Sequence, residues 1–507
     1  MLLSEILYEN EYTSSYKAED ISFSRITVNT ARLEKNCVFV CMRGMRFDSH
    51  SMASLASLSG ACAVIADHDG RVELPDGFPL FRVQDTHAIL PYLISRSLGN
   101  AWQKSRLIAI TGTNGKTSTL YLTDAILRRA GYSVGCVGTV DILLNGAPLP
   151  LRKEEEDAVR TMTTPDPTVL FPILCRMAEA GADYIIMEAS SHALAQKKLL
   201  PLTFELGLFT NLSPEHLDYH ANMEDYLRAK ALLFPLCRRA ILNGDSPYSY
   251  EIMRRTGVKS LLVGSEPTHD FYSHSVLSHG ARGTDFTLRY QKEEIPIALS
   301  LSGTYNVENA RMAAAAALTL GIERRYVTEA LASFEGIPGR LERLTPPELP
   351  FAVFIDYAHT EAALKKVLST VRSFRLPHER IVLLFGCGGE RDRTKRAPMG
   401  TAAESYADEI IVTSDNPRKE NPHEIISDIL RGMPNKKKRR VTVNRARAIR
   451  EAVLRAKAGD IILLCGKGHE KYEITSDGVH PFDERALVAE ALAERQKNQK
   501  NKESDVT

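Results

Sequence analysis

The sequence lacks the cysteine spacing of a disulfide framework or a zinc cluster. Its eight cysteines are scattered over 507 residues, and no two of them form a C-x-x-C pair. Disulfide-rich domains and zinc sites both draw on closely spaced cysteines, whereas scattered thiols are usual where the compartment is reducing. The pattern therefore predicts reduced thiols in a cytoplasmic protein.

A strong charge of one sign and a long apolar run are also missing. The 64 Lys and Arg residues nearly balance 63 Asp and Glu residues, which gives a formal net charge of +1. No uninterrupted apolar stretch reaches about 18 residues, and residues 1–10 show no basic region followed by an apolar run. We therefore expect no nucleic-acid partner, no membrane span and no signal peptide.

Length and patterning predict three α/β domains. A chain of 507 residues, 44% of them hydrophobic, can bury several cores. Short apolar runs alternate with helical stretches, which is typical of α/β units. We predict a small N-terminal α/β domain over 1–100, a central phosphate-loop ATPase-like domain over 101–336 and a C-terminal Rossmann-like domain over 337–507. The expected strands include 36–42, 61–66 and 80–83, then 184–188, 206–209 and 240–242, then 351–355, 381–385, 409–412 and 461–464.

A phosphate-binding loop is expected directly after the apolar run 107–110. A β-type run, a glycine turn and a helix-like segment let backbone N–H groups and a helix N-terminus surround phosphate oxygens. Lys116 supplies a mobile cation, and the Thr117 hydroxyl suits Mg²⁺. The general motif has glycine where Ile110 stands, so an ordinary glycine turn is the alternative. The residues of the loop are Gly112, Thr113, Asn114, Gly115, Lys116, Thr117 and Ser118.

Four expected strands of the third domain end in polar sequences rich in glycine and charge. They are residues 356–359, 386–393, 415–418 and 466–470. The carboxyl ends of strands in an open parallel sheet meet at one crevice, where ligands bind. Solvated turns are the alternative, but loops of α/β units carry function disproportionately. These four sequences predict one ligand site.

These residues resemble the Mur ligases of peptidoglycan synthesis, and most of all the member that adds the third residue of the peptide. The phosphate loop of that family also lacks the early glycine, so Ile110 fits the resemblance. The resemblance covers nearly the whole chain. The matching segments are 112–117, 163–165, 187–194, 210–212, 216–220, 303–309, 339–340 and the four strand-end sequences.

The resemblance implies an ATP-dependent ligase of cell wall synthesis that activates a carboxylate as an acyl phosphate, which an amine then attacks. Phosphoryl transfer between two anions depends on cations and in-line positioning. The implied substrates are ATP, a UDP-N-acetylmuramoyl dipeptide and meso-diaminopimelate, and the implied enzyme is a cytoplasmic monomer that needs Mg²⁺. Besides the phosphate loop, the implied ATP contacts are Asn309, Arg340, Asp356 and His359, with domain closure about Gly336 and Gly339.

The implied catalytic residues are Lys116, Lys230, Glu188 and His216, and the implied Mg²⁺ ligands are Thr117, Glu188, His216 and a carbamylated Lys230. From its sequence alone, Lys230 looks like a solvent-facing lysine on an amphipathic helix. Addition of CO₂ requires the neutral amine and turns a cation into an anionic oxygen ligand.

For the nucleotide-sugar peptide, the resemblance implies contacts from Thr30, Thr163, Thr164, Ser190, Gln196 and Lys198. The family usually has arginine where Lys198 stands, and it commonly has Asp-Ser-Arg where this chain has Asn29, Thr30 and Ala31. Thr30 keeps a hydroxyl, but the acidic and basic partners are missing. Drift in an intact enzyme and a changed donor substrate both explain this difference.

The strand-end sequences of the third domain favour meso-diaminopimelate over lysine. Diaminopimelate carries a second amino acid head, so its pocket needs a cation for the extra carboxylate and an acceptor for the extra ammonium. Arg418 offers a planar fork, Pro417 stiffens the turn, and Glu470 accepts from the ammonium. The implied diaminopimelate contacts are Arg391, Asp415, Asn416, Pro417, Arg418, Gly466 and Glu470.

Two other functions remain open at this point. A related ligase adding lysine or another amino acid, including a folylpolyglutamate-type enzyme, would share the phosphate loop. A diverged NTP-binding regulator, or a nucleic-acid-binding protein, would draw on the basic run 436–440, which is more often a solvated turn. We expect the polar segment 495–507 to be disordered.

Overall fold

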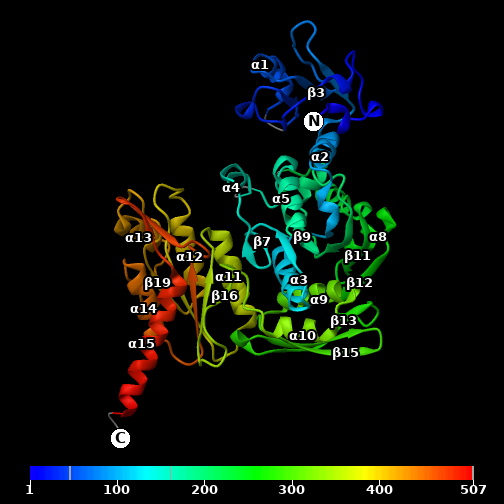
Figure 1. Ribbon diagram of the computed structural model, residues 1–507. Coiled ribbons are helices and arrows are strands. Elements are labelled where there is room, and N and C mark those ends of the chain that lie inside the picture. The colour runs from blue at the N-terminus through cyan, green and yellow to red at the C-terminus, as the bar shows by residue number, and fades with distance from the viewer. Residues whose placement is uncertain (45–46, 160–161, 218, 505–507) are drawn as a thin grey trace. The chain divides into compact units, whose positions relative to one another are not determined.

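The chain forms two compact units in the computed structural model, which describes residues 1–44, 47–159, 162–217 and 219–504 (Figure 1). The first unit comprises Met1–Tyr272 and Arg311–Val327, and the second comprises Ser273–Ala310 and Thr328–Thr507. The α/β class is confirmed. The three domain boundaries stay a prediction, although one four-stranded sheet lies within residues 1–100 and one six-stranded sheet lies within 337–507.

The first unit begins with a parallel four-stranded sheet in the order β1-β2-β3-β4. Three of its strands match the predicted segments, whereas β1 was not predicted. The strands are β1 (Arg25–Thr27), β2 (Cys37–Val40), β3 (Ala63–Asp67) and β4 (Leu80–Val83), and the helices are α1 (Ala53–Leu58) and α2 (Thr86–Ser97).

The rest of the first unit contains eight paired strands in the order β12-β11-β10-β5-β9-β6-β7-β8. Residues 107–111 of β5 are all buried, as expected for a central parallel strand covered on both faces. Helices α3 and α5 pack against β9, the neighbour of β5 (Figure 1). The strands are β5 (Arg106–Thr111), β6 (Val134–Val137), β7 (Ile142–Leu144), β8 (Ala147–Pro148), β9 (Tyr184–Glu188), β10 (Phe204–Phe209), β11 (Cys237–Asn243) and β12 (Ser260–Gly264). The helices are α3 (Lys116–Arg129), α4 (Lys153–Val159), α5 (Pro167–Glu179), α6 (Ser191–Ala195), α7 (Met223–Ala231) and α8 (Pro247–Thr256).

The second unit is built on a six-stranded sheet in the order β16-β17-β21-β18-β19-β20. All of its pairs are parallel except β16 with β17, and separate apolar clusters cover its two faces. Because β21 lies between β17 and β18, the four polar sequences end neighbouring strands. The strands are β16 (Glu342–Arg343), β17 (Ala352–Asp356), β18 (Arg380–Phe385), β19 (Glu409–Val412), β20 (Arg439–Val441) and β21 (Asp460–Cys465).

Helices cover this sheet, and the second unit also contains two hairpins, β14–β15 and β22–β23. The hairpin β14–β15 alternates buried and exposed residues, a pattern that sequence analysis did not use. The helices are α11 (Glu361–Phe374), α12 (Arg396–Tyr406), α13 (Pro422–Leu430), α14 (Arg445–Arg455) and α15 (Glu484–Ser504). The remaining elements are β13 (Phe271–Ser278), β14 (Thr284–Tyr290), β15 (Glu293–Leu299), α9 (Thr304–Thr319), α10 (Arg324–Ala332), β22 (Tyr472–Thr475) and β23 (Gly478–Pro481).

Two predictions about charged segments are corrected here. The predicted disordered end is helical as far as Ser504, and α14 and α15 lie side by side (Figure 1). Arg495 fixes this contact, because its guanidinium donates to the carbonyls of Val453 and Ala456 at 2.8 Å. The basic run 436–440 is a 3-10 helix over Lys436–Lys438 followed by the first two residues of β20. Among the described residues, no helix is long and apolar enough to span a membrane.

Candidate active site

The phosphate-binding loop joins the end of β5 to the start of α3. Gly112 has φ +145°, and a Cβ there would lie 2.0 Å from Thr210 Oγ1, so the loop requires glycine. Asn211, in the loop that follows β10, holds the phosphate loop: its carbonyl accepts from the Thr113 N–H at 2.8 Å, and its side chain accepts from the Asn114 N–H at 2.9 Å. The geometry is that of a fixed backbone cradle at a helix N-terminus, which suits phosphate.

Glu188 is a fully buried carboxylate at the end of β9, beside the loop. One of its oxygens accepts from Thr117 Oγ1 at 2.8 Å and from the Thr139 N–H at 3.0 Å, and the other accepts from Thr139 Oγ1 at 3.0 Å. The cluster therefore gathers one carboxylate and two hydroxyls next to the phosphate loop.

Lys230 is buried, in contrast to the solvent-facing lysine that its segment suggests. Its side chain is 1% exposed, and Nζ donates to the Gly112 carbonyl at 2.8 Å and lies 4.5 Å from the centre of the Tyr226 ring. Burial, reinforced by the charge of Lys116, holds the pKa of Lys230 well below its ordinary value. The shift favours the neutral amine relative to an exposed lysine.

His216 is exposed and adopts a left-handed backbone, with φ +57°. Its ring packs edge-on against Tyr226 and His192, with centroid distances of 6.1 and 5.2 Å. It thereby lies on the same aromatic cluster that Lys230 contacts through Tyr226. Asp218, part of the motif that suggested His216, lies outside the described residues.

The strand-end loops of the second unit enclose a cavity of about 320 Å³. It confirms that the four polar sequences meet. The buried Arg396 supports one of these loops, because its guanidinium donates to the Gly388 carbonyl and to both oxygens of Glu420. The cavity is lined by Tyr357, His359, Gly388, Arg391, Lys395, Asp415, Asn416, Arg418, Gly466 and Glu470.

Comparison with known proteins matches both units to one family. Residues 110–317 match the Mur ligase middle domain, and residues 339–468 match the Mur ligase, glutamate ligase domain. A Syntrophomonas wolfei protein named UDP-N-acetylmuramoyl-L-alanyl-D-glutamate--2,6-diaminopimelate ligase is 37% identical over 93% of this chain and 95% of its own. The chain belongs to the Mur ligase family.

Other relatives of this Mur ligase agree in sequence and in structure. A Bacillus cereus protein with the same name is 35% identical over 95% of this chain and 96% of its own. A solved structure of a ligase of that name has a TM-score of 0.73 and 28% identity, and covers 98% of this chain and 99% of its own. The Mycobacterium tuberculosis folylpolyglutamate synthase complexed with ADP and AMPPCP shares the fold, with a TM-score of 0.53 and 19% identity over 74% of this chain and 91% of its own.

The residues expected to hold the nucleotide-sugar peptide of this Mur ligase fall into two groups. Thr30, Gln196 and Lys198 line a cavity of about 520 Å³ in the first unit. The other three residues lie beside Glu188: Thr164 Oγ1 donates to the Glu188 carbonyl at 2.8 Å and accepts from the Ser190 N–H, and Thr163 Oγ1 accepts from Thr139. Lys198 is an ion-pair partner of Asp166 at 2.6 Å.

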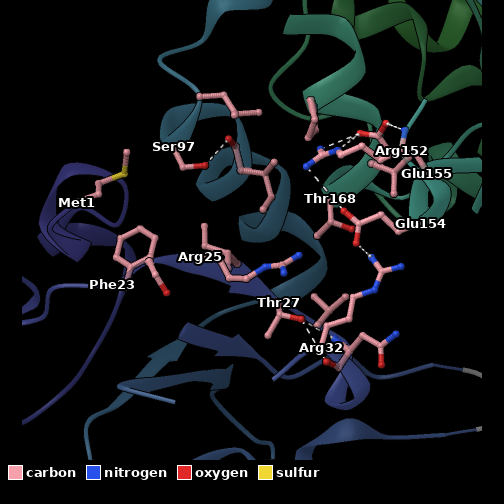
Figure 2. A pocket seen from close by; sticks show the side chains of 18 residues that line it. Met1, Phe23, Arg25, Thr27, Arg32, Ser97, Arg152, Glu154, Glu155 and Thr168 are labelled. Carbon is pink, nitrogen blue, oxygen red and sulfur yellow. Dashed lines mark hydrogen bonds and ion pairs between the residues drawn. The ribbon is translucent and has the colours of Figure 1, made fainter. Parts of the chain in front are cut away.

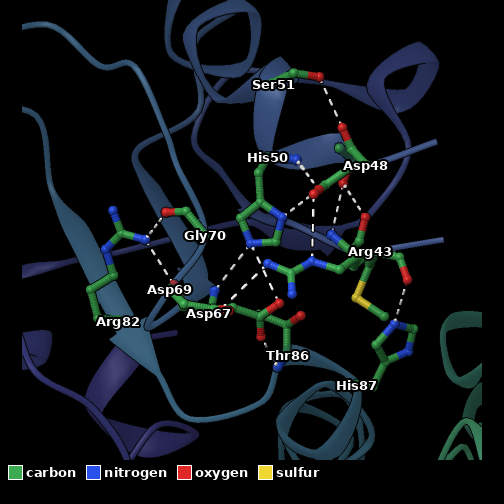
Figure 3. A network of polar contacts seen from close by, with 12 residues as sticks. Arg43, Asp48, His50, Ser51, Asp67, Asp69, Gly70, Arg82, Thr86 and His87 are labelled. Atoms are coloured by element: carbon green, nitrogen blue, oxygen red, sulfur yellow. Dashed lines mark hydrogen bonds and ion pairs between the residues drawn. The ribbon is translucent and has the colours of Figure 1, made fainter.

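A buried histidine network supports the first of these cavities (Figure 3). His50 Nδ1 lies 2.5 Å from Asp48, and Nε2 accepts from the Asp67 N–H at 3.2 Å, which assigns the Nδ1 proton to the Asp48 contact. Asp67 in turn accepts from the N–H of Thr86, the first residue of α2. Sequence analysis missed this network, although Asp48 and His50 directly flank Ser49, which lines the cavity.

A third cavity, of about 290 Å³, lies where β1 and the end of α2 meet α4 and α5 (Figure 2). Four of its charged side chains form two pairs, Arg32 with Glu154 at 3.5 Å and Arg152 with Glu155 at 2.8 Å, and Arg25 pairs with Glu34 at 2.7 Å. We assign it no ligand.

Two of the residues expected near ATP in the second unit, Asp356 and His359, contact backbone groups of nearby turns. Asp356 accepts from the Leu341 and Ala358 N–H groups, and burial raises the pKa of its carboxyl. His359 is exposed, with Nδ1 2.8 Å from the Tyr357 carbonyl. Asn309 is buried on α9, and Arg340 is exposed beside Gly339.

The side chains of the first unit can supply only part of the coordination shell of a Mg²⁺ ion. Among the described residues, no group of three or more His, Cys, Asp or Glu side chains is arranged to hold a metal ion. Thr117 and Glu188, 2.8 Å apart, offer hard oxygen donors. Mg²⁺ commonly takes one or two such protein ligands and completes its shell with water and phosphate oxygens. The residues therefore fit an ion that arrives with a nucleotide.

Proposed function

We propose that this Mur ligase is an ATP-dependent amide-bond ligase that adds meso-diaminopimelate to UDP-N-acetylmuramoyl-L-alanyl-D-glutamate in peptidoglycan synthesis. The observation that carries the proposal is the second-unit cavity. At the carboxyl ends of the parallel strands it combines the guanidinium groups of Arg391 and Arg418 with the carboxylate of Glu470. The names of the full-length relatives support the same substrate pair. We expect the enzyme to act as a cytoplasmic monomer.

The first step joins the carboxylate of the dipeptide to the γ-phosphoryl group of ATP and releases ADP. The N-terminus of α3 presents backbone N–H groups to the phosphates, and Lys116, which now donates to the carbonyls of Gly112 and Thr113, has the reach to turn toward them. Mg²⁺, when bound beside Thr117 and Glu188, supplies positive charge that offsets the repulsion between the two anions.

Lys230 is proposed to carry a carbamate in the active enzyme. The neutral amine attacks the carbon of CO₂ and loses a proton to give the carbamate, and the contact of Nζ with the Gly112 carbonyl puts the modified group beside the phosphate loop. His216 is proposed to contribute its imidazole as a ligand of Mg²⁺.

The second step joins the diaminopimelate amine to the acyl carbon and releases inorganic phosphate. Arg418 and Arg391 are proposed to bind carboxylates, and Glu470 is proposed to accept from the distal ammonium. A site built from such polar partners discriminates strongly against lysine, which lacks the distal carboxylate. Water must be excluded meanwhile, and closure about Gly336 and Gly339, both with positive φ, is proposed to do this.

An ATP-dependent phosphate-release assay tests the proposal. UDP-N-acetylmuramoyl-L-alanyl-D-glutamate is supplied with meso-diaminopimelate, lysine, glutamate or no amine, and the products are identified by mass. The proposal predicts phosphate release coupled to a diaminopimelate adduct. Preference for lysine or glutamate over diaminopimelate would favour the related ligases, and no turnover with any amine would favour an NTP-binding regulator.

A further inference from the structure

The Asn416 side chain joins three segments around the second-unit cavity. Its Oδ1 accepts from Lys467 Nζ at 2.8 Å and from the Ile474 N–H at 3.0 Å. Its Nδ2 donates to Glu470 Oε2 at 3.0 Å. One carboxamide therefore links the loop after β19, the loop after β21 and the hairpin β22–β23, and the two donors on Oδ1 fix which way it faces.

Lys467 is a buried ammonium at the centre of this junction. Its side chain is 0% exposed, and Nζ donates to Asn416 Oδ1 and to the Tyr472 carbonyl at 2.9 Å, with the Asp415 carboxylate 3.6 Å away. Three oxygens thus surround a group that has three N–H donors. Within the described chain, Lys467 is absent from the lining of the cavity, so its contacts serve the residues that do line it.

Strand β22 holds the next part of the same loop. The Ile474 carbonyl accepts from the Arg418 N–H at 3.0 Å, so both backbone groups of Ile474 face the loop after β19. Arg418 has φ +54°, a left-handed conformation that persists for a non-glycine residue only where its surroundings hold it. The hairpin supplies that restraint.

We propose that Lys467 and strand β22 form a positioning device for the amino-acid cavity. They fix Asn416, Glu470 and Arg418 relative to one another, and so set the spacing between the ammonium acceptor and the carboxylate donor. This spacing distinguishes an amino acid with a second amino acid head from one without it. The inference rests on the proposed function, because it concerns selection of the same diaminopimelate.

Lys467→Met tests the role of the lysine, because methionine keeps an unbranched side chain of similar volume and removes all three donors. We expect the kcat/KM for diaminopimelate to fall about tenfold or more, as for the loss of a charge-assisted hydrogen bond. The KM values for ATP and for the UDP-dipeptide should stay within about twofold, since those substrates contact other residues. Lys471→Met is the matched control, because Lys471 is 71% exposed and lies 3.8 Å from Asp483.

Ile474→Pro tests the second part and covers the case in which the lysine variant does not fold. Proline removes the N–H from which Asn416 accepts, and because that N–H donates to Asn416 and not to β23, the substitution costs the hairpin no ladder hydrogen bond. We expect the preference for diaminopimelate over lysine to shrink about tenfold with an unchanged melting temperature.

The wild-type assay separates the two proposals. If the wild type does not use diaminopimelate, the proposed function is wrong and the device falls with it. If the wild type uses diaminopimelate but folded variants keep its kcat/KM and its preference over lysine, only the positioning device is wrong. An equal rise in the KM for all three substrates would also overturn it, because that result indicates a general structural role.

Discussion

Arg418→Ala is the substitution that most directly tests how the cavity selects its amino acid. The guanidinium is half-buried, and Nη1 donates to the Gly389 carbonyl at 2.8 Å and to the Asn416 carbonyl at 3.4 Å. In the described part of the chain, its Nε and Nη2 groups donate to no protein acceptor. One edge of the guanidinium therefore anchors it, and the other edge is the one expected to bind a substrate carboxylate.

The size of the expected effect follows from this partial burial. Truncating one partner of a buried, hydrogen-bonded charge pair costs about 2–5 kcal/mol, and a half-buried group belongs at the lower end, about 2–3 kcal/mol. At about 1.36 kcal/mol per tenfold, the kcat/KM for diaminopimelate should fall about 30- to 160-fold. The kcat/KM for lysine should change little, because lysine has no second carboxylate.

Steady-state kinetics of the wild type and of Arg418→Ala measure the kcat/KM for diaminopimelate and for lysine. The UDP-dipeptide and ATP are kept saturating, and adducts are quantified by mass. Lys419→Ala is the matched control, since Lys419 is the exposed neighbour of Arg418. Equal wild-type efficiency with lysine, or equal losses for both amino acids in Arg418→Ala, would refute the role assigned to this guanidinium.

Three further predictions concern the first unit. Lys230→Ala should lower turnover about 10²-fold, and bicarbonate or short carboxylates should restore part of it. Gly112→Ala should raise the KM for ATP and cost about 1–3 kcal/mol of stability, because the new Cβ meets Thr210 Oγ1 at 2.0 Å. Glu155→Gln should cost about 1–3 kcal/mol at pH 7, measured by urea unfolding, because the buried Glu155 carboxylate accepts from Arg176 at 2.9 Å.

The stability that the Glu155 carboxylate contributes should be lost at acid pH. Burial alone would raise the pKa of Glu155, but hydrogen bonds from Arg152 and Arg176 outweigh burial and leave the pKa lowered. A lowered pKa contributes stability above the unfolded value of about 4.3, and this contribution is lost as the pH falls through the folded value. Glu155→Gln should therefore flatten the acid limb of the stability curve, and exposed Glu156→Gln should leave it unchanged.

Matched controls serve the other two predictions. Arg228→Ala, at a 65% exposed position on the helix that carries Lys230, should keep turnover. Gly131→Ala, which also has a positive φ but meets no atom within 4 Å, separates the clash at Gly112 from backbone strain. Wild-type turnover in Lys230→Ala, or equal effects of the two alanine substitutions on the KM for ATP, would contradict the assignments.

Local sequence determined the features that depend on neighbouring residues or on a general rule of topology. The phosphate loop could be predicted because strand, glycine turn and helix are contiguous from residue 106 to 129. The second-unit cavity could be predicted because parallel strands place their carboxyl ends at one edge, whatever their order. The resemblance to Mur ligases added roles for residues that no local rule singles out, such as Lys230.

The tertiary structure decided what lies against each side chain. Helical periodicity could not show that Lys230 is buried, because its partner, the Gly112 carbonyl, lies 118 residues away in the chain. The polar composition of segment 495–507 predicts disorder, yet Arg495 donates to carbonyls at the end of α14 and the helix continues to Ser504. Lys467 likewise became informative only when three loops met around Asn416. In each case the deciding energy comes from burial and hydrogen bonds between distant segments, which composition and periodicity do not encode.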